Sequence, residues 1–213
     1  TKPKAMNYAL QYARGAFVSV YDAEDLPHPR QLRDVQATFA SSRDEVVCVQ
    51  AKLNIHNRTA SWFSRQFTLE YSALFDSMLP GLAAIGSPLM LGGTSNHFRR
   101  DALEALGAWD PFNVTEDADL GLRISRAGFD VALLDSTTWE EAPETLRVWL
   151  PQRTRWLKGW MQTYLVHTRQ PLRLFADLGP WRFLMLQCLL GGFLLSALMH
   201  PLFYVLVVLE VLG

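Results

Sequence analysis

The sequence predicts an α/β domain that continues into a strongly apolar C-terminal segment. Short apolar runs alternate with segments of helical spacing through residues 1–149, as in α/β folds with a largely parallel sheet. The 213 residues are 49% hydrophobic with a net charge of −1, which excludes a disordered tail and argues against a dedicated nucleic-acid binder. In the apolar segment, residues 181–213, Arg182 and Glu210 are the only charged residues.

The predicted elements begin near the first residue. Residues 4–14 have the apolar spacing of a helix, and the apolar run 16–21 is typical of a buried strand. Two prolines introduce a helix expected over 30–40, and a second strand is expected over 45–53. A long helix over 62–79 carries an aromatic face that is most simply a core face.

Further along the chain, a glycine turn at 92–95 precedes a short helix over 102–106, which Asp101 is expected to cap. An acidic segment then begins a helix over 116–127, and the apolar run 129–134 predicts the last strand.

The C-terminal segment predicts membrane contact. Residues 181–199 are apolar and long enough to span a bilayer, and after an interruption at 200–201 the run 202–213 begins a second span. Six basic residues and one acidic residue lie in 150–182, a bias that marks the cytoplasmic side. Aromatic and basic side chains mixed over 156–174 predict helices lying on the membrane surface. A buried hairpin of core helices is the alternative for the apolar runs.

Three acidic residues follow the first predicted strand: Asp22, Glu24 and Asp25. Ligands of open α/β sheets bind beyond the carboxyl ends of strands. Acids this close repel one another, and a hard divalent cation, Mg²⁺ or Mn²⁺, that bridges to a diphosphate would neutralise them. An acidic turn that caps the next helix is the alternative.

A second acidic group, Thr-Glu-Asp-Ala-Asp at residues 115–119, stands at a predicted helix start. The helix N-terminus keeps a carboxylate ionised there, and an ionised, partly buried aspartate can accept a proton from a substrate hydroxyl. Ordinary capping by Thr115, with acids in the first turn, is the alternative. Around this group, residues 110–144 hold nine acidic residues and two basic ones.

Two further motifs are weaker by themselves. In Gln-Arg-Thr-Arg-Trp at residues 152–156, arginine suits a phosphate and the indole suits a sugar face. A basic amphipathic helix at the membrane surface is the alternative for that motif. The turn Gly-Gly-Thr-Ser-Asn at residues 92–96 can line a ligand close to the backbone.

Taken together, the order and spacing of these motifs resemble the family 2 glycosyltransferases, most closely the membrane-bound, cellulose-synthase-like β-glycan synthases. The resemblance runs from Lys4 through the first membrane helix. Residues 4–10 resemble the family's Lys-x-x-Asn-x-x-Leu helix, and residues 93–96 stand where the family places its acceptor-side loop. The resemblance implies a GT-A-like, Rossmann-type mixed sheet followed by interfacial helices and a transmembrane helix.

The resemblance also implies roles for single residues. Asp22 would contact the sugar nucleotide and share a metal ion with Glu24 or Asp25, and the choice between these two stays open because Glu24 replaces the family's usual second aspartate. Asp117 would be the catalytic base, with Glu116 beside it on the acceptor side. The residues implied at the donor diphosphate are Lys4, Gln152 and Arg155. The other residues implied at the acceptor are Trp156, Gly93, Thr94 and Ser95.

The implied function is the inverting transfer of a sugar from a nucleotide-diphosphate sugar, a UDP-hexose, to a growing β-glycan or another membrane-associated acceptor, including a lipid-linked one. Mg²⁺ or Mn²⁺ is the implied cofactor, and the Gln-x-x-Arg-Trp pattern favours processive synthesis. The implied location is the bacterial inner membrane, as a multi-pass protein with a cytoplasmic catalytic part and additional synthase subunits as partners. The alternatives are an inactive, glycan-binding membrane scaffold and a metal-dependent phosphohydrolase.

The predicted organisation has three parts. They are a partial GT-A catalytic domain over 1–149, interfacial amphipathic helices with the Gln-x-x-Arg-Trp motif over 150–180, and a membrane region over 181–213. The family opens with a strand and an Asp-Asp-Gly-like segment that binds the nucleotide base, and no residues before Thr1 supply it. We therefore expect an N-terminally truncated fragment of a larger protein.

Overall fold

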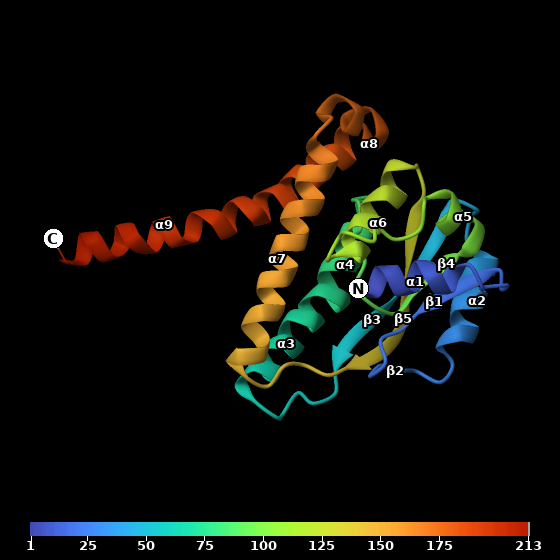
Figure 1. Ribbon diagram of the computed structural model, residues 1–213, viewed down its shortest axis with the longest axis horizontal. Coiled ribbons are helices and arrows are strands. Elements are labelled where there is room, and N and C mark those ends of the chain that lie inside the picture. The colour runs from blue at the N-terminus through green and yellow to red at the C-terminus, as the bar shows by residue number, and fades with distance from the viewer. Residues whose placement is uncertain (213) are drawn as a thin grey trace.

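The computed structural model describes residues 1–212, and Gly213, the last residue of the predicted membrane region, lies outside the described residues. A sheet with helices on both sides forms the body of the molecule. Helix α7 (Leu146–Thr168) runs along one side of this body, and helix α9 (Gly192–Leu212) projects away from it (Figure 1).

The sheet has five strands in the order β1-β4-β3-β5-β2. Their bounds are Phe17–Val20 for β1, Leu26–Pro27 for β2, Val46–Ile55 for β3, Asn96–Arg99 for β4 and Asp130–Glu140 for β5. Within residues 1–212, β3 and β5 pair in parallel and the other three strand pairs are antiparallel. The mixed sheet is confirmed, whereas the expectation of a largely parallel sheet is wrong, because β4 inserts in the reverse direction between β1 and β3.

Most of the segments predicted to be helical are helices in the structure. Besides α7 and α9, their bounds are Lys2–Leu10 for α1, Gln31–Ser41 for α2, Trp62–Ser72 for α3, Leu79–Ala84 for α4, Arg100–Ala105 for α5, Glu116–Arg126 for α6 and Pro171–Leu186 for α8. Two π-helical segments, Ala73–Met78 and Gln187–Gly191, join α3 to α4 and α8 to α9.

Several boundaries differ from the sequence expectation. Helix α1 ends at Leu10, and β5 extends well beyond residue 134 to Glu140. The short helix α5 begins at Arg100, so Asp101 does not cap it. Asp101 lies in the first turn instead, where its carboxylate accepts a hydrogen bond from the next backbone N–H at 2.8 Å.

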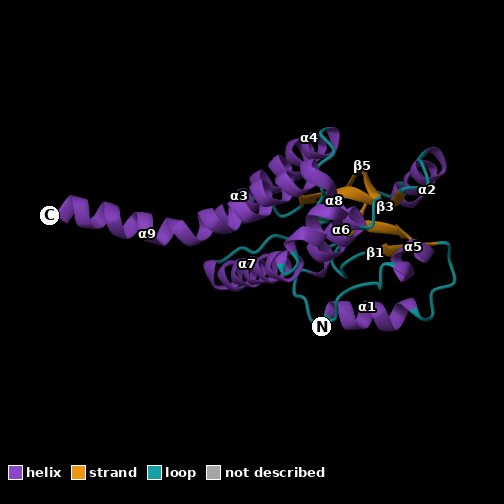
Figure 2. Cartoon of the chain, turned by 90° about the horizontal axis from the view of Figure 1, so that it is seen from above, coloured by secondary structure: helices purple, strands orange, loops and turns teal. Residues whose placement is uncertain are grey.

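The core forms on both sides of the central strands. Helix α2 lies on one side of β3 and β5, and the α3–α4 run lies on the other (Figure 2). Phe39 of α2 packs beside Val49 of β3, whereas Phe75, in the π-helical segment after α3, packs beside Leu53. Helix α6 packs against β4 through Leu120, in the cluster that also contains the buried ends of β1 and β3. The acidic N-terminus of α6 is therefore held firmly against the sheet.

The C-terminal helices form one long apolar run. Residues Pro171–Leu212 are the one stretch of the described chain that is long and apolar enough to cross a membrane. Gly179 kinks this run with a φ of +71°, a left-handed conformation that favours glycine. Helix α9 continues through Pro201, so the two apolar runs on either side of 200–201 meet within one helix.

Part of this run packs against the body of the molecule. Leu174, Leu186, Leu190 and Leu194 are buried together with Leu122 of α6. By contrast, residues 198–212 are all exposed. The packed part therefore continues past residue 181, the predicted start of the membrane region, and the apolar surface lies on the outer part of α9.

Candidate active site

The site lies where three strands of common direction end. β4 is antiparallel to both β1 and β3, and β5 is parallel to β3, so the carboxyl ends of β1, β3 and β5 share one edge of the sheet. Ligands of open α/β sheets bind at such an edge. Asp22 follows β1, Glu140 ends β5, and Ile55 ends β3 beside Trp156 of α7.

The acidic turn after β1 is bonded to the glycine turn before β4. The Asp22 backbone N–H donates to Asp25 Oδ2 at 2.8 Å and to Thr94 Oγ1 at 3.2 Å, and the Thr94 hydroxyl donates to Asp25 Oδ2. Asp25 Oδ1 is buried and has no hydrogen-bond partner among residues 1–212. Burial raises the pKa of Asp25, and the hydrogen bonds from Thr94 and Asp22 oppose this rise only in part.

A lysine of α1 reaches the same turn. Lys2 forms an ion pair with Asp22 and donates from Nζ to the Gly93 carbonyl oxygen at 2.6 Å. Lys4, the predicted donor-binding lysine, instead lies with its ammonium 5.1 Å from the centre of the Phe112 ring. The two side chains point to different sides because residues two apart on a helix are separated by about 200°. The structure therefore brings Lys2, and not Lys4, to Asp22.

Asp117 lies across the Gly93 backbone from this acidic turn. A Cβ atom at Gly93 would be 3.4 Å from Asp117 Oδ2, and the Ala118 N–H donates to Asp117 Oδ1 at 2.8 Å. Burial raises the pKa of Asp117 to about 6, the neighbouring Glu116 carboxylate adds to the rise, and Lys2 opposes it. The acidic turn after β1 and the acidic start of α6 thus lie on either side of the glycine turn. The carboxylate on the α6 side, Asp117, is more basic than an ordinary aspartate.

Ser95 has a different role from the predicted one. Its side chain is fully buried and donates to Thr138 Oγ1 of β5 at 2.5 Å. Its backbone N–H donates to the Val20 carbonyl oxygen at 2.8 Å, which ties the glycine turn to the end of β1. The Ser95 hydroxyl is bonded inside the core, and the acceptor contact implied for Ser95 stays a prediction.

Glu140 is a residue of this site that sequence reasoning missed. Leu26 of β2 is paired with Trp139 of β5, so Asp25 and Glu140 are the next residues along the two strands. Burial raises the pKa of Glu140 to about 7, the charges of Asp25 and Asp22 add to the rise, and the Tyr71 hydroxyl donates to Glu140 Oε2 at 3.1 Å. The last residues of β5 do not alternate between apolar and polar, so no pattern predicted that the strand extends to Glu140. The acidic residues around Glu140 were the one feature of the sequence that pointed to this residue.

Helix α7 brings the Gln-x-x-Arg-Trp motif to the site. Gln152 is half-buried, and its Oε1 atom is buried without a hydrogen-bond partner among residues 1–212. Arg155 is exposed, and Trp156 packs against Phe67 of α3 with ring centres 5.9 Å apart. Arg153, a variable position of the motif, lies with its guanidinium carbon 5.1 Å from the centre of the Trp156 ring. Part of the indole face is therefore already covered.

The donor set suits a cation that also binds phosphate. Among residues 1–212, no group of three or more His, Cys, Asp or Glu side chains is arranged to hold a metal alone. Mg²⁺ sites in phosphate chemistry use one or two carboxylates and complete their shell with phosphate oxygens and water. Asp22 and Asp25 provide such a pair, and the unpartnered Asp25 Oδ1 is an available ligand atom. Glu24 is exposed and forms no hydrogen bond or ion pair within the described chain, which favours Asp25 over Glu24.

The fold is that of a known class of sugar-transferring proteins. The solved structure of a mannosyltransferase from Pyrobaculum calidifontis, in complex with GDP-Man and Mn²⁺, superposes with a TM-score of 0.60 at 21% sequence identity. The match covers 100% of this chain and 59% of that one. The fold is therefore GT-A-like, as the sequence resemblance implied.

The sequence comparisons identify the family. The family profile described as Glycosyl transferase family group 2 matches residues 17–212, so the chain belongs to the family 2 glycosyltransferases. A probable glycosyltransferase of Bacillus subtilis, YdaM, is 29% identical over 74% of this chain, and a beta-monoglucosyldiacylglycerol synthase of Synechocystis is 31% identical over 89% of it. A cellulose synthase catalytic subunit of Komagataeibacter xylinus is 25% identical over 76%. The matches span 38%, 40% and 22% of the lengths of these relatives.

The half-buried charge of Asp117 is expected to lower the stability of the fold. Its folded-state pKa of about 6 exceeds the ordinary value of 3.8, so the unfavourable charge is fully present above pH 6 and disappears as the pH falls through 3.8. We expect Asp117→Asn to raise the free energy of unfolding by about 1 to 3 kcal/mol at neutral pH, with no gain near pH 3.5. Thermal unfolding of the purified protein measures this difference.

Asp119→Asn is the matched control on the same helix. Burial opposes the ionisation of Asp119, but hydrogen bonds and charges from His167 and Arg123 hold its pKa below the usual range. At pH values above the ordinary aspartate pKa, the charge of Asp119 stabilises the fold. Asp119→Asn is therefore expected to lower Tm at neutral pH. Equal effects of the two substitutions would contradict this account of the site.

Proposed function

We propose that this chain carries the catalytic centre of an inverting glycosyltransferase that moves a hexose from a nucleotide-diphosphate sugar to a hydroxyl of a membrane-associated acceptor. The observation that carries the proposal is the half-buried Asp117, with a pKa of about 6, facing the Asp22–Asp25 turn across the Gly93 backbone. The relatives include a cellulose synthase that is UDP-forming by name and enzymes that make a glucosyl diacylglycerol. A UDP-hexose donor and a glycan or lipid acceptor are therefore the proposed substrates.

Asp117 is the proposed general base. It is largely ionised at neutral pH because its pKa is about 6, and it is more basic than an ordinary aspartate. In the proposed step it takes the proton of the acceptor hydroxyl while that oxygen attacks the anomeric carbon. The bond from the anomeric carbon to the diphosphate oxygen breaks, and the electron pair leaves with the nucleoside diphosphate. A single displacement of this kind inverts the anomeric centre without a covalent sugar–enzyme intermediate.

The residues around Asp22 form the proposed donor side. Asp22 and Asp25 would hold Mg²⁺ or Mn²⁺, which when bound neutralises negative charge on the leaving diphosphate. Lys2 adds a positive charge beside Asp22. Gln152 and Arg155 of α7 are proposed to bind the diphosphate from the opposite side, because the Gln152 amide nitrogen and the guanidinium of the exposed Arg155 can donate hydrogen bonds to phosphate oxygens.

The acceptor side is proposed to lie between α6 and α7. Glu116 is buried next to the base, with 8% of its surface exposed, and the Gly93 backbone lies against Asp117. Thr94 contributes by holding Asp25, and the part of the Trp156 face that its neighbours leave free is proposed to stack on a sugar. Glu140 joins this list as a second carboxyl group of raised pKa. Processive synthesis remains a proposal that rests on the Gln-x-x-Arg-Trp resemblance.

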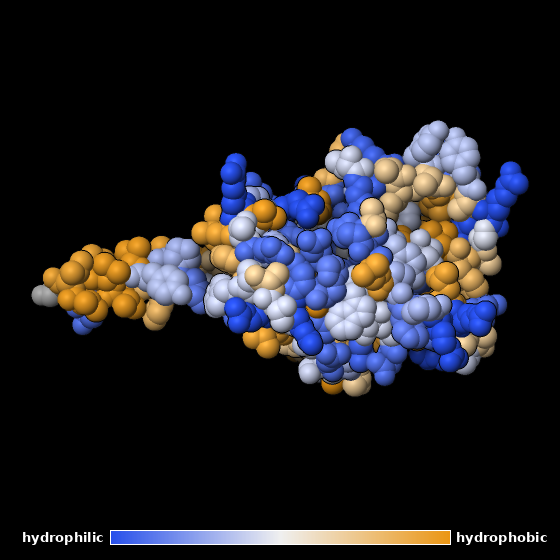
Figure 3. Space-filling view, turned by 90° about the horizontal axis from the view of Figure 1, so that it is seen from below, coloured by the Kyte–Doolittle hydropathy of each residue, from blue (hydrophilic) through white to orange (hydrophobic). Residues whose placement is uncertain are grey.

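The apolar surface supports a membrane location. The outer part of α9 is a largely hydrophobic projection crossed by a paler, more polar band, whereas much of the visible face of the body is hydrophilic (Figure 3). Leu172 and Phe175 of α8 are exposed apolar side chains within the basic segment 150–182. We propose that α9 spans the bacterial inner membrane, that α7 and α8 lie at its surface, and that the catalytic part is cytoplasmic. Multi-pass topology and additional synthase subunits are part of the same proposal.

The base assignment is tested on the full-length protein in membrane vesicles. With a panel of labelled nucleotide sugars, Asp117→Asn is expected to lower the transfer rate by about 10² to 10⁴-fold, because a general base is worth that much. Donor binding is expected to stay within a few-fold of the unchanged protein. The exposed Glu104→Gln serves as the control and is expected to leave transfer unaltered.

Three outcomes would contradict the proposal. Near-normal transfer by Asp117→Asn would show that another group is the base. Donor hydrolysis without any dependence on an acceptor would favour a phosphohydrolase. Donor binding with neither transfer nor hydrolysis across the panel would favour an inactive scaffold.

The pH dependence of kcat/KM tests the protonation state of the base. Transfer is expected to fall about tenfold per pH unit below about pH 6, because protonated Asp117 cannot accept the acceptor proton. This fall in rate is the acid limb of the pH profile. Glu140 is the other group whose protonation could produce it, because its pKa is about 7. The acid limb is therefore expected to persist in Glu140→Gln, and its loss in that variant would transfer the assignment from Asp117 to Glu140.

A pair of substitutions tests the cation ligand. Asp25→Asn is expected to raise the Mn²⁺ concentration needed for half-maximal transfer by tenfold or more, because it removes the charge and alters the unpartnered oxygen atom. Glu24→Gln, one residue earlier and exposed, is expected to change this concentration less than twofold. The reverse ranking of the two variants would make Glu24 the ligand.

A further inference from the structure

Helix α7 faces α6 with three residues spaced four apart. Gly159, Thr163 and His167 are the buried residues of α7 among those described, and we call them the α6-facing stripe. Residues four apart lie on one side of a helix, so the stripe is a straight contact line about 12 Å long. The line begins one turn after Arg155, the arginine of the Gln-x-x-Arg-Trp motif.

The first two members of the stripe contact the segment just before the base. A Cβ atom at Gly159 would lie 2.4 Å from the Thr115 methyl group, so only glycine lets α7 approach this closely. The Asn113 amide donates to Thr163 Oγ1 at 2.8 Å, and Asn113 Oδ1 accepts from the Thr115 backbone N–H at 3.0 Å. Residues 113–115 are thereby attached to α7 immediately before Asp117.

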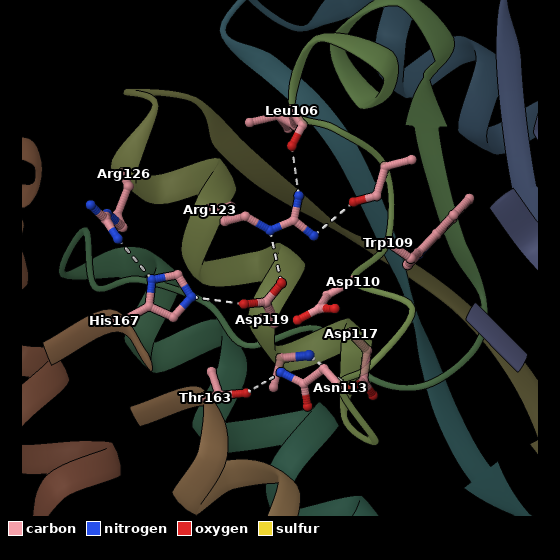
Figure 4. A network of polar contacts seen from close by, with 12 residues as sticks. Leu106, Trp109, Asp110, Asn113, Asp117, Asp119, Arg123, Arg126, Thr163 and His167 are labelled. Carbon is pink, nitrogen blue, oxygen red and sulfur yellow. Dashed lines mark hydrogen bonds and ion pairs between the residues drawn. The ribbon is translucent and has the colours of Figure 1, made fainter. Parts of the chain in front are cut away.

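The third member, His167, is bonded to the base helix itself (Figure 4). His167 Nε2 lies 2.8 Å from Asp119 Oδ1, and Arg126 Nη1 lies 2.9 Å from His167 Nδ1. A guanidinium can only donate, so Nδ1 is the acceptor and Nε2 carries the proton that is donated to Asp119. His167 and Asp119 have 5% and 4% of their surfaces exposed, so this contact is shielded from water.

Asp119 and Arg126 extend the contact to the surrounding backbone and to α8. Asp119 Oδ2 accepts from Arg123 Nε at 2.8 Å, and the other two nitrogens of Arg123 donate to the carbonyl oxygens of Leu106 and Ala108, each at 2.7 Å. Arg126 also pairs with Asp177 of α8 at 2.6 Å. Every oxygen of the Asp119 carboxylate thus has a directional partner.

From this arrangement we propose that Asp119 and His167 are a positioning pair that sets the register between the helix of the proposed base and the helix of the Gln-x-x-Arg-Trp motif. The inference rests on the proposed function of Asp117. A slip of one turn along α7 would displace the motif by about 5.4 Å relative to Asp117, far more than a reacting geometry tolerates.

The neighbouring apolar contacts cannot perform this task alone. Leu122, Leu174 and Leu186 pack α6 against α8, and the α7 residues that contact this cluster are only partly buried. The hydrogen bond from His167 to Asp119 and the steric fit of Gly159 on Thr115 each allow one register. The α6-facing stripe therefore fixes where α7 lies along α6, rather than only holding the two helices together.

The test uses the full-length protein in membrane vesicles, with the panel donor that it transfers. His167→Ala is expected to lower kcat at least tenfold while the KM for the nucleotide sugar changes less than threefold, because the Asp22–Asp25 turn does not touch the stripe. His167→Gln is expected to restore kcat to within about threefold of the unchanged protein, since its amide can both donate to Asp119 and accept from Arg126. Leu165→Ala, on the exposed side of the same helix, is the matched control and is expected to have no effect.

The outcomes separate this inference from the proposed function. An unchanged kcat in His167→Ala, with Asp117→Asn inactive, would overturn the positioning pair and leave the base assignment standing. Full transfer by Asp117→Asn would instead overturn the proposed function. If His167→Ala does not accumulate as folded protein, His167→Phe gives the decision, because it keeps a ring at this position and removes the hydrogen bonds to Asp119 and Arg126. A loss of kcat of threefold or more in that variant supports the positioning pair, and a smaller change overturns it.

Discussion

The backbone of residues 92–95 is the feature on which the rest of the site depends. It lies between two acidic groups, with Thr94 bonded to Asp25 on one side and Gly93 against Asp117 on the other. The segment is itself fixed, because a Cβ atom at Gly92 would come within 3.0 Å of Leu53 and the Ser95 hydroxyl is bonded inside the sheet. Because Gly93 has no side chain, the Asp117 carboxylate can lie against the backbone of this segment. The same segment separates Asp117 from Asp25, which Thr94 holds on the other side.

The site gathers more negative charge than its own cations neutralise. Burial raises the pKa of Asp117 to about 6 and of Glu140 to about 7, and it also raises the pKa of Asp25, with Lys2 as the nearest opposing charge. Folding would be easier without these carboxyl groups in these places. Unfavourable groups of this kind are retained at functional sites, where the strain is part of the mechanism. The proposed cation and base roles give a physical reason for both ends of the cluster.

Helix α7 links the apolar helix α9 to the candidate active site. Its first half bears the Gln-x-x-Arg-Trp motif, its α6-facing stripe packs on α6, and its end leads through α8 into α9. The near-neutral net charge and the 49% hydrophobic content are averages over these parts. Acidic residues outnumber basic ones nine to two in residues 110–144, basic residues dominate 150–182, and residues 198–212 of the apolar helix are all exposed.

Local pattern alone determined the alternation of helices and strands, the helices near 30–40, 62–79 and 116–127, and the grouping of the acidic and Gln-x-x-Arg-Trp motifs that indicated the family. These features depend on periodicity and spacing, which neighbouring residues carry. Only the tertiary structure decided the reversed direction of β4, the extension of β5 to Glu140, the choice of Lys2 over Lys4 and the inward turn of Ser95. Strand pairing, the burial of a charge and the side of a helix that meets a partner are set by contacts between residues far apart in the chain, and no local pattern encodes them.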